Sequence, residues 1–305
     1  MLYLNLENKL SDNNKVVIVG AGTMGAGIAQ VFSLSGYDVS LYATSERSKN
    51  GALASIRSSL ERLCKKGIVE QGAAEGALSR VKFVNHWEAI AEAGVVIEAV
   101  PESIEVKKTV LEACDNYLRP DALVGTNTSS ISITRLACFL SDPSRLVGLH
   151  FFNPAPLMSL VELVVGVHTS PTIKEGAVRL IEKVGKVPIV VQNSPGFVVN
   201  RMLCPMINEA FFILGQGVAS AEEIDQGMKL GCNHPIGPLG LADLIGLDVL
   251  LSIMDVLLEQ TGDSKYRAAP LLREFVDAGM LGRKVFRGVF SYEEASKTPI
   301  QRVAF

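Results

Sequence analysis

The feature that most constrains the fold is an apolar run, Lys15 to Gly20, that leads directly into the turn Gly20-Ala21-Gly22-Thr23-Met24-Gly25 and then into a helical pattern. A continuous β-branched run is typical of a strand buried on both faces of a parallel sheet. Gly20 allows the tight turn, Gly22 lets the backbone approach a pyrophosphate, and Gly25 lets helix and strand pack closely. The phosphates of a dinucleotide would then lie on the helix N-terminus, where free N–H groups meet the anion.

Strands and helices alternate through the residues that follow. Strands are predicted at residues 38–42, 81–84, 94–100, 122–126, 146–151 and 187–191, with helices at roughly 46–66, 103–117 and 131–140. This alternation predicts an α/β fold, a Rossmann-type, doubly wound and mostly parallel sheet.

The second part of the chain has a different pattern. The turn residues Ser194-Pro195-Gly196-Phe197 mark a boundary, and residues 198–214, 220–230, 239–259 and 271–278 then follow a helical period. We therefore expect a dinucleotide-binding domain at 1–194 and a C-terminal all-helical domain at 195–305. So much apolar helical surface would suit a dimer contact.

The tip of the second predicted strand departs from the usual pattern of a dinucleotide-binding sheet. An acidic residue normally stands there and bonds the adenosine ribose, but Ala43 occupies the position. Loss of the acid removes repulsion against a 2′-phosphate, and Arg47 could pair with one. The alternative is that Glu46 or backbone groups bind the ribose and that NAD is still the cofactor.

Polar side chains follow several other predicted strands. Glu98 and Glu102 stand at the end of one, and the segment 127–130 (N-T-S-S) follows another. His150 lies near the end of a third. In doubly wound sheets the ligand lies beyond the carboxyl ends of the strands. We therefore expect these side chains to converge on one site.

The pair His150 and Glu162 is the main candidate for chemistry. His150 stands in G-L-H-F-F-N-P (148–154), and Glu162 lies inside the apolar run 160–165. Carboxylates rarely occupy such a run without a partner. A histidine that the glutamate holds in one tautomer would be that partner and a general base. The alternative is a core histidine capping a strand and a glutamate at a turn.

Composition argues against several classes of function. The 305 residues are 48% hydrophobic and 20% charged, with a net charge of −3, which fits a soluble globular protein. We find no basic patch for nucleic acid and no apolar run long enough to span a membrane. Residues 1–7 do not resemble a secretory signal. Five scattered cysteines show no metal spacing and point to a reducing, cytoplasmic compartment, and no metal site is expected.

The chain resembles the short-chain L-3-hydroxyacyl-CoA dehydrogenase family, which includes the bacterial 3-hydroxybutyryl-CoA dehydrogenases. The resemblance runs from about Lys15 to Tyr292. It rests on six motifs in the family's order: G-A-G-T-M-G at 20–25, I-E-A-V-P-E at 97–102, T-N-T-S-S at 126–130, G-L-H-F-F-N-P at 148–154, P-G-F-V-V-N-R at 195–201 and H-P-I-G-P-L-G-L-A-D-L-I-G-L-D at 234–248.

The resemblance implies roles for the matching positions. His150 would take the proton from the substrate's 3-hydroxyl, and Glu162 would orient the imidazole and stabilise its charged form. Ser129 and Asn200 would hydrogen-bond the reacting oxygen and the surroundings of the histidine. Ser59 and Lys66 would contact coenzyme A. The candidate cofactor-binding residues are Gly20, Gly22, Thr23, Met24, Gly25, Ala43, Arg47, Glu102, Lys107, Asn127 and Asn153.

The family also implies an acyl-CoA substrate, NAD as cofactor and a homodimer through the helical domain, and NADP is the alternative cofactor. The sequence departs from the family at two positions. Ala43 replaces the ribose-binding aspartate, and Phe286 stands where relatives carry glycine in the C-terminal glycine-rich run.

The sequence is also compatible with two other functions. One is a dehydrogenase of a free 3-hydroxy acid, such as gulonate or carnitine, on the same fold. The N-T-S-S segment and the Ser59 and Lys66 pair argue against it. The other is a non-catalytic, crystallin-like relative. Against that, the four catalytic positions all carry competent residues.

Overall fold

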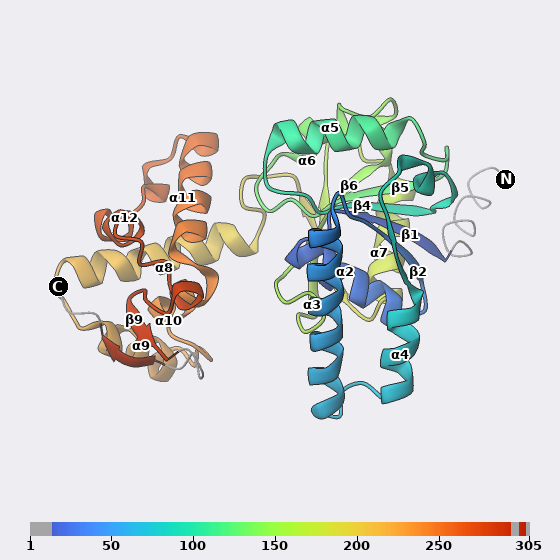
Figure 1. Ribbon diagram of the computed structural model, residues 1–305. Helices are drawn as coiled ribbons and strands as arrows, with labels where there is room; N and C mark the ends of the chain where they lie inside the picture. Colours follow the sequence, from blue (N-terminus) through green and yellow to red (C-terminus); the bar gives the residue numbers. More distant parts are fainter. Residues whose placement is uncertain (1–13, 294–298, 303–305) are drawn as a thin grey trace. The chain divides into compact units, whose positions relative to one another are not determined.

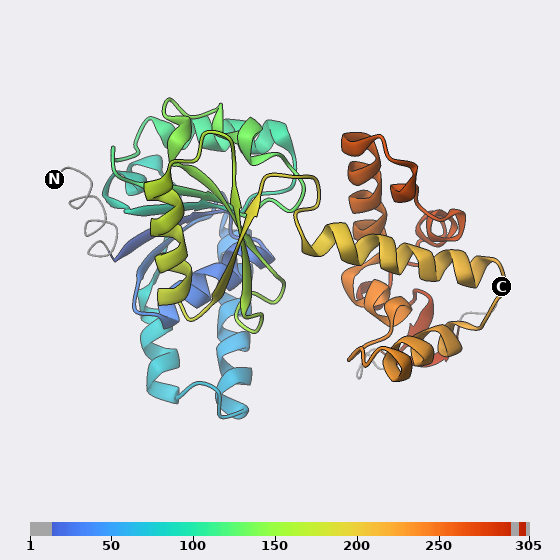
Figure 2. The same cartoon turned by 180° about the vertical axis from the view of Figure 1, so that it is seen from behind.

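A computed structural model describes residues 14–293 and 299–302 of the chain. The chain divides into two compact units, residues 1–197 and 198–305, and each is described by itself (Figures 1 and 2). The expectation about residues 1–7 lies outside the described residues.

The first unit is built on an eight-stranded sheet in the order β3-β2-β1-β4-β5-β6-β7-β8. The strands are β1 (Lys15–Val19), β2 (Asp38–Tyr42), β3 (Val81–Val84), β4 (Val95–Glu98), β5 (Leu123–Thr126), β6 (Leu146–Phe151), β7 (Leu160–Val165) and β8 (Val187–Gln192). Neighbouring strands are parallel except β6 and β7, which run antiparallel. The predicted doubly wound, mostly parallel sheet is confirmed.

Helices cover both faces of this sheet, because alternate residues of each strand face opposite sides. Val16 and Ile18 of β1 belong to the core under α2 (Thr23–Leu34), α3 (Glu46–Lys65), α4 (Gln71–Arg80) and α7 (Pro171–Lys183). Val17 and Val19 face a second core that includes η1 (Trp87–Glu92) and α5 (Ile104–Asp115). Further along that face lies α6 (Ile133–Ala137), and η2 (Pro143–Arg145) contacts α6. Figure 1 shows α5 and α6 on one side of the strands and α2 on the other.

Five elements of the first unit are not predicted from the sequence. They are the helices α4 and α7, the short helices η1 and η2, and the strand β7, which contains Glu162 and runs antiparallel to β6. The carboxyl end of β6 therefore faces the start of β7. This reversal places His150 of β6 directly opposite Glu162 of β7.

The second unit is mainly helical, as predicted. Its elements are α8 (Val199–Gly215), α9 (Ala221–Gly231), α10 (Pro238–Ile245), α11 (Leu247–Thr261), η3 (Ser264–Tyr266), α12 (Pro270–Asp277), η4 (Arg283–Val285), β9 (Phe290–Tyr292) and β10 (Pro299–Arg302). The last two form a small antiparallel sheet that the sequence did not predict. The helix expected over 239–259 is two helices, because Gly246 has φ +104 and interrupts the backbone between them.

Phe286 lies in the left-handed region, with φ 59. Glycine adopts that conformation more easily than any other residue, which agrees with the glycine that the family resemblance predicts there. The Phe286 ring packs partly buried against the core of the second unit. Apolar contact therefore compensates for the unfavourable backbone at this position.

Candidate active site

The glycine-rich turn connects β1 to α2 as expected. Its three glycines differ in whether the surrounding protein leaves room for a side chain. Gly20 has φ +116, and a Cβ there would lie 2.6 Å from the carbonyl oxygen of Ala99. A Cβ on Gly25 would lie 1.7 Å from the carbonyl oxygen of Gly20. A Cβ on Gly22 would meet nothing within 4 Å. The protein's own packing thus requires Gly20 and Gly25, while Gly22 leaves open space in front of the turn.

The start of α2 fits a dinucleotide pyrophosphate. Gly22 is the N-cap of α2, no side chain caps the helix, and its first turn carries no acidic residue. Backbone N–H groups at such a terminus bind phosphate well, aided by the helix dipole. The open space at Gly22 and the uncapped N–H groups together suit the group that the sequence predicts here.

Alanine substitutions should separate the two kinds of glycine. We expect Gly22→Ala to change the free energy of unfolding by less than about 1 kcal/mol. It should weaken NADH binding at least about tenfold, since a methyl group blocks close approach of the phosphates. Gly25→Ala should destabilise by about 1–3 kcal/mol or more through overpacking. Urea unfolding and calorimetry of NADH binding measure both effects. Equal destabilisation by the two substitutions would contradict this division.

His150 and Glu162 form a buried pair at the carboxyl end of β6. They are direct register partners across the antiparallel strands β6 and β7, so their side chains lie side by side on one face. The His150 Nδ1 atom lies 2.6 Å from Glu162 Oε2, and both side chains are buried. A carboxylate that accepts from Nδ1–H fixes the tautomer whose Nε2 carries the lone pair. This arrangement suits an imidazole that exchanges a proton through Nε2.

Aromatic rings surround the imidazole. The ring centroid of Phe152 lies 4.5 Å from that of His150, and the centroid of Phe197 lies 5.6 Å away. Phe197 is buried and has φ 50, a left-handed backbone that is unusual for phenylalanine. Strained backbone of this kind persists where the surroundings fix it, often beside a functional residue. The rings restrict how far the imidazole can rotate.

The loops after β5 and β6 are tied together next to His150. Asn127 Oδ1 accepts a hydrogen bond of 2.9 Å from the amide of Phe151. Asn153 is exposed and precedes a cis peptide bond to Pro154.

The Lys186 ammonium donates to the carbonyl oxygens of Ala155 and Met158 at 2.8 and 2.7 Å. Burial lowers the pKa of Lys186. These bonds hold the loop in place, a role of Lys186 that no sequence motif indicates.

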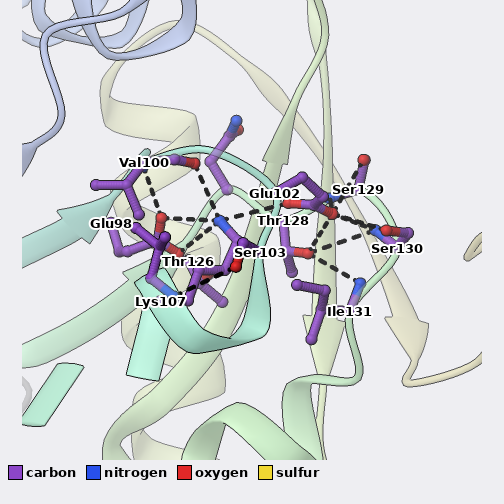
Figure 3. Close-up of polar contacts among 12 residues, drawn as sticks. Glu98, Val100, Glu102, Ser103, Lys107, Thr126, Thr128, Ser129, Ser130 and Ile131 are labelled. Carbon is purple, nitrogen blue, oxygen red and sulfur yellow. Dashed lines mark hydrogen bonds and ion pairs between the residues drawn. The ribbon is translucent and has the colours of Figure 1, made fainter. Parts of the chain in front are cut away.

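Glu102 organises the N-T-S-S segment (Figure 3). Its Oε1 accepts hydrogen bonds from the Thr128 hydroxyl at 2.7 Å, from the Ser129 amide at 2.9 Å, and from the Ser130 amide and hydroxyl at 2.9 and 2.8 Å. The Ser129 hydroxyl also donates, at 3.2 Å. Burial acts to raise the pKa of Glu102, but the Lys107 ammonium and these donors outweigh it and lower the pKa. Glu102 is therefore a carboxylate at neutral pH.

Lys107 lies inside the protein rather than at its surface. Its Nζ donates to both oxygens of Glu98, at 2.8 and 2.9 Å, and lies 3.4 Å from Glu102 Oε2. Glu98 also accepts from the Thr126 hydroxyl at 2.6 Å and from the Val100 amide at 2.7 Å. Glu98 and Lys107 are each 1% exposed. The sequence marked Glu98 as a strand-end acid but did not identify it as the partner of Lys107.

The remaining candidates lie farther from this cluster along the chain. Ala43 is buried at the end of β2, and Arg47 is exposed on α3. Ser59 lies on α3, and Lys66, exposed, is the C-cap of that helix. Asn200 lies in the first turn of α8, in the second unit. The roles of these residues stay predictions.

Two chemical classes find no support among residues 14–293 and 299–302. No group of three or more His, Cys, Asp or Glu side chains there could hold a metal ion. Burial raises the pKa of the Cys114 and Cys204 thiols to about 12, so neither is a thiolate nucleophile. Within the same residues, no helix is long and apolar enough to cross a membrane.

A Rossmann sheet with this turn at the start of α2 defines a dinucleotide-binding protein. The family model "3-hydroxyacyl-CoA dehydrogenase, NAD binding domain" matches residues 15–194, and the model of the C-terminal domain of the same family matches residues 196–292. The chain therefore belongs to the 3-hydroxyacyl-CoA dehydrogenase family.

Individual relatives cover almost the whole chain. A 3-hydroxybutyryl-CoA dehydrogenase from Bradyrhizobium diazoefficiens is 46% identical over 93% of this chain and 97% of its own length. One from Clostridioides difficile is 45% identical over 92% of this chain and all of its own. The crystal structure of (S)-3-hydroxybutyryl-CoA dehydrogenase from Ralstonia eutropha has a TM-score of 0.89 and 49% identity, covering 93% of this chain and 100% of that one.

Proposed function

We propose that the protein interconverts short-chain (S)-3-hydroxyacyl-CoA, such as 3-hydroxybutyryl-CoA, and the corresponding 3-oxoacyl-CoA, with His150 and Glu162 as the acid–base pair. The observation that carries the proposal is the buried contact of 2.6 Å between His150 Nδ1 and Glu162 Oε2 at the end of β6. Relatives named 3-hydroxybutyryl-CoA dehydrogenase at 42–46% identity support the substrate class.

His150 and Glu162 carry out the proton transfer in this proposal. In the oxidative direction His150 Nε2 accepts the proton of the 3-hydroxyl as the C3–O bond becomes a carbonyl. Glu162 then faces an imidazolium and stabilises its charge. In the reductive direction the imidazolium returns this proton to the oxygen. The nicotinamide, when bound, supplies or accepts the hydride.

Ser129 and Asn200 are proposed to bond the reacting oxygen. The Ser129 hydroxyl donates to Glu102 over 3.2 Å, the longest contact that Glu102 Oε1 accepts in this segment. Because four shorter contacts would remain on that oxygen, the hydroxyl can turn to substrate with little loss. A donor placed where negative charge develops lowers the barrier to hydride transfer.

The proposed partners follow the family. The proposed cofactor is a nicotinamide dinucleotide, NAD as in the family or its alternative NADP, with its pyrophosphate at the start of α2 and its adenosine end near Ala43. Ser59 and Lys66 are separated by about two helical turns, so they project from one side of α3 and could both reach coenzyme A. Exposed apolar residues of the second unit, among them Met202 and Leu230, support a homodimer through that unit. The scattered cysteines support a cytoplasmic setting.

The substrate class is tested by comparing acetoacetyl-CoA with free acetoacetate. We expect kcat/KM for the CoA ester to be higher by on the order of 100-fold, because binding energy from the remote part of a substrate is used in the transition state. Initial rates of NADH oxidation measure this. Turnover of the free acid without turnover of its CoA ester would replace the proposal by a free-acid dehydrogenase. Absence of dinucleotide binding in calorimetry would indicate a non-catalytic relative.

A further inference from the structure

A cavity lies at the adenosine end of the predicted cofactor site. It has a volume of about 340 Å³ and opens between the ends of β2 and β3. Its lining residues are Ala43, Thr44, Ser45, Glu46, Lys49, Phe83, Val84 and Asn85. The Ala43 amide donates to Val84 across these strand ends at 2.9 Å. Ligand pockets typically measure roughly 300–1,000 Å³, so this cavity can take a phosphorylated ribose.

The strand that leads into the cavity is hydrogen-bonded to the glycine-rich turn. The amide of Gly20 donates to the carbonyl oxygen of Tyr42, the last residue of β2, at 3.3 Å. In Rossmann domains the ribose next to the pyrophosphate lies at the tip of the second strand. A dinucleotide held at the start of α2 would therefore direct its 2′ position toward this cavity.

Position 43, at the strand tip, carries no charge that would repel an anion. Ala43 is 7% exposed and presents only a methyl group where an acid would normally stand. A carboxylate at that position bonds a free 2′-hydroxyl and repels a 2′-phosphate. The hydroxyl groups of Thr44 and Ser45 line the cavity instead. The lining therefore offers neutral hydrogen-bonding groups at the position that usually selects NAD.

Two charged side chains, those of Lys49 and Glu46, line the cavity, whereas Arg47 is not among its lining residues. In the structure the Lys49 Nζ lies 3.3 Å from Glu46 Oε1, and the side chains are 40% and 77% exposed. Exposed pairs of this kind contribute roughly 0–1 kcal/mol. A dianionic phosphate can therefore displace the Glu46 carboxylate toward solvent and take its place beside the ammonium.

We propose that this cavity binds the 2′-phosphate of NADP(H), and that Lys49 is the residue that determines this specificity. The inference rests on the proposed function, because it assumes a dinucleotide at the start of α2. It goes beyond the family's NAD and assigns the contact to Lys49 in place of Arg47, the cation that the sequence suggested.

Calorimetry with nucleotide fragments tests the inference without turnover. Adenosine 2′,5′-bisphosphate should bind the wild-type protein about tenfold more tightly than adenosine 5′-monophosphate, the gain of one charge-assisted contact. Lys49→Met should remove this gain. Arg57→Met, which removes an exposed cation from the same helix, should retain it. Ala43→Asp should reverse the order of the two affinities, with far-UV circular dichroism as the check on folding.

The outcomes distinguish the inference from the proposed function. Equal or weaker binding of the bisphosphate to the wild type would overturn the 2′-phosphate site. If NADH still reduced acetoacetyl-CoA in that case, the proposed function would stand. Loss of the gain in Arg47→Met but not in Lys49→Met would overturn the assignment to Lys49. Failure of both fragments and of NADH to bind would contradict the proposed function itself.

Discussion

Replacing His150 by glutamine should lower kcat for acetoacetyl-CoA reduction by about 10³-fold, because general acid–base catalysis contributes roughly 10²–10⁴-fold. Glutamine keeps a polar side chain next to Glu162, but its amide cannot carry a proton to or from the substrate oxygen. The affinity for NADH should change little, since His150 lies at the end of β6 and the cofactor's pyrophosphate is predicted at the start of α2. Steady-state rates and calorimetry measure the two effects separately.

The exposed His168, after β7 in the same unit, offers a matched control. His168→Gln should leave kcat within about twofold of wild type, as expected of a surface change. Near wild-type turnover by folded His150→Gln would contradict the assigned role.

Glu162→Gln should also reduce kcat, and the double substitution should be much less damaging than the product of the two single effects. Residues that act as one unit show this non-additivity.

Lys107→Met should destabilise the protein by about 3–5 kcal/mol, because removing one partner of a buried ion pair leaves the other charge uncompensated. Glu98 would lose two hydrogen bonds from the ammonium while it stays 1% exposed. Glu102 would also lose the charge that acts to lower its pKa. Urea unfolding followed by circular dichroism measures the loss in the free energy of unfolding.

Two further variants show whether buried charge is the cause. Lys108→Met, one residue along α5, should change stability by less than about 0.5 kcal/mol, because that pair is exposed. Its Nζ lies 3.8 Å from Glu112, and both side chains are 52% exposed. The double variant Glu98→Gln with Lys107→Met should recover part of the loss, since no net charge stays buried. A single variant as stable as Lys108→Met would refute the argument.

Local patterns predicted much of the first unit. The strand, turn and helix from Lys15 onward form where the sequence places them, because residues adjacent in the chain set the β-branched run and the glycine spacing. The prediction of a single helix at 239–259 was wrong in one respect. The hydrophobic period continues across Gly246, but the helical backbone conformation ends there. Periodicity describes which side chains face the core and carries little information about a single backbone dihedral angle.

The contacts between side chains were harder to predict than the helices and strands. The sequence named Lys107 as a site residue, but only the fold shows that its ammonium lies against Glu98. The sequence analysis named Arg47 as the cation for a 2′-phosphate, whereas Lys49 is the cation that lines the cavity. The direction in which each side chain leaves α3 decides this. Such contacts depend on how side chains are oriented in the folded protein, and the neighbouring residues in the sequence carry little information about that orientation.

The sequence by itself determined the class of fold, the place of the phosphate-binding turn and the family, because these depend on short-range patterns and on motif order. It also supplied both members of the pair His150 and Glu162. Only the tertiary structure decided that they meet. The reversal of β7 against β6 sets their register, and strand pairing is a long-range contact between segments that carry no local mark of their partner.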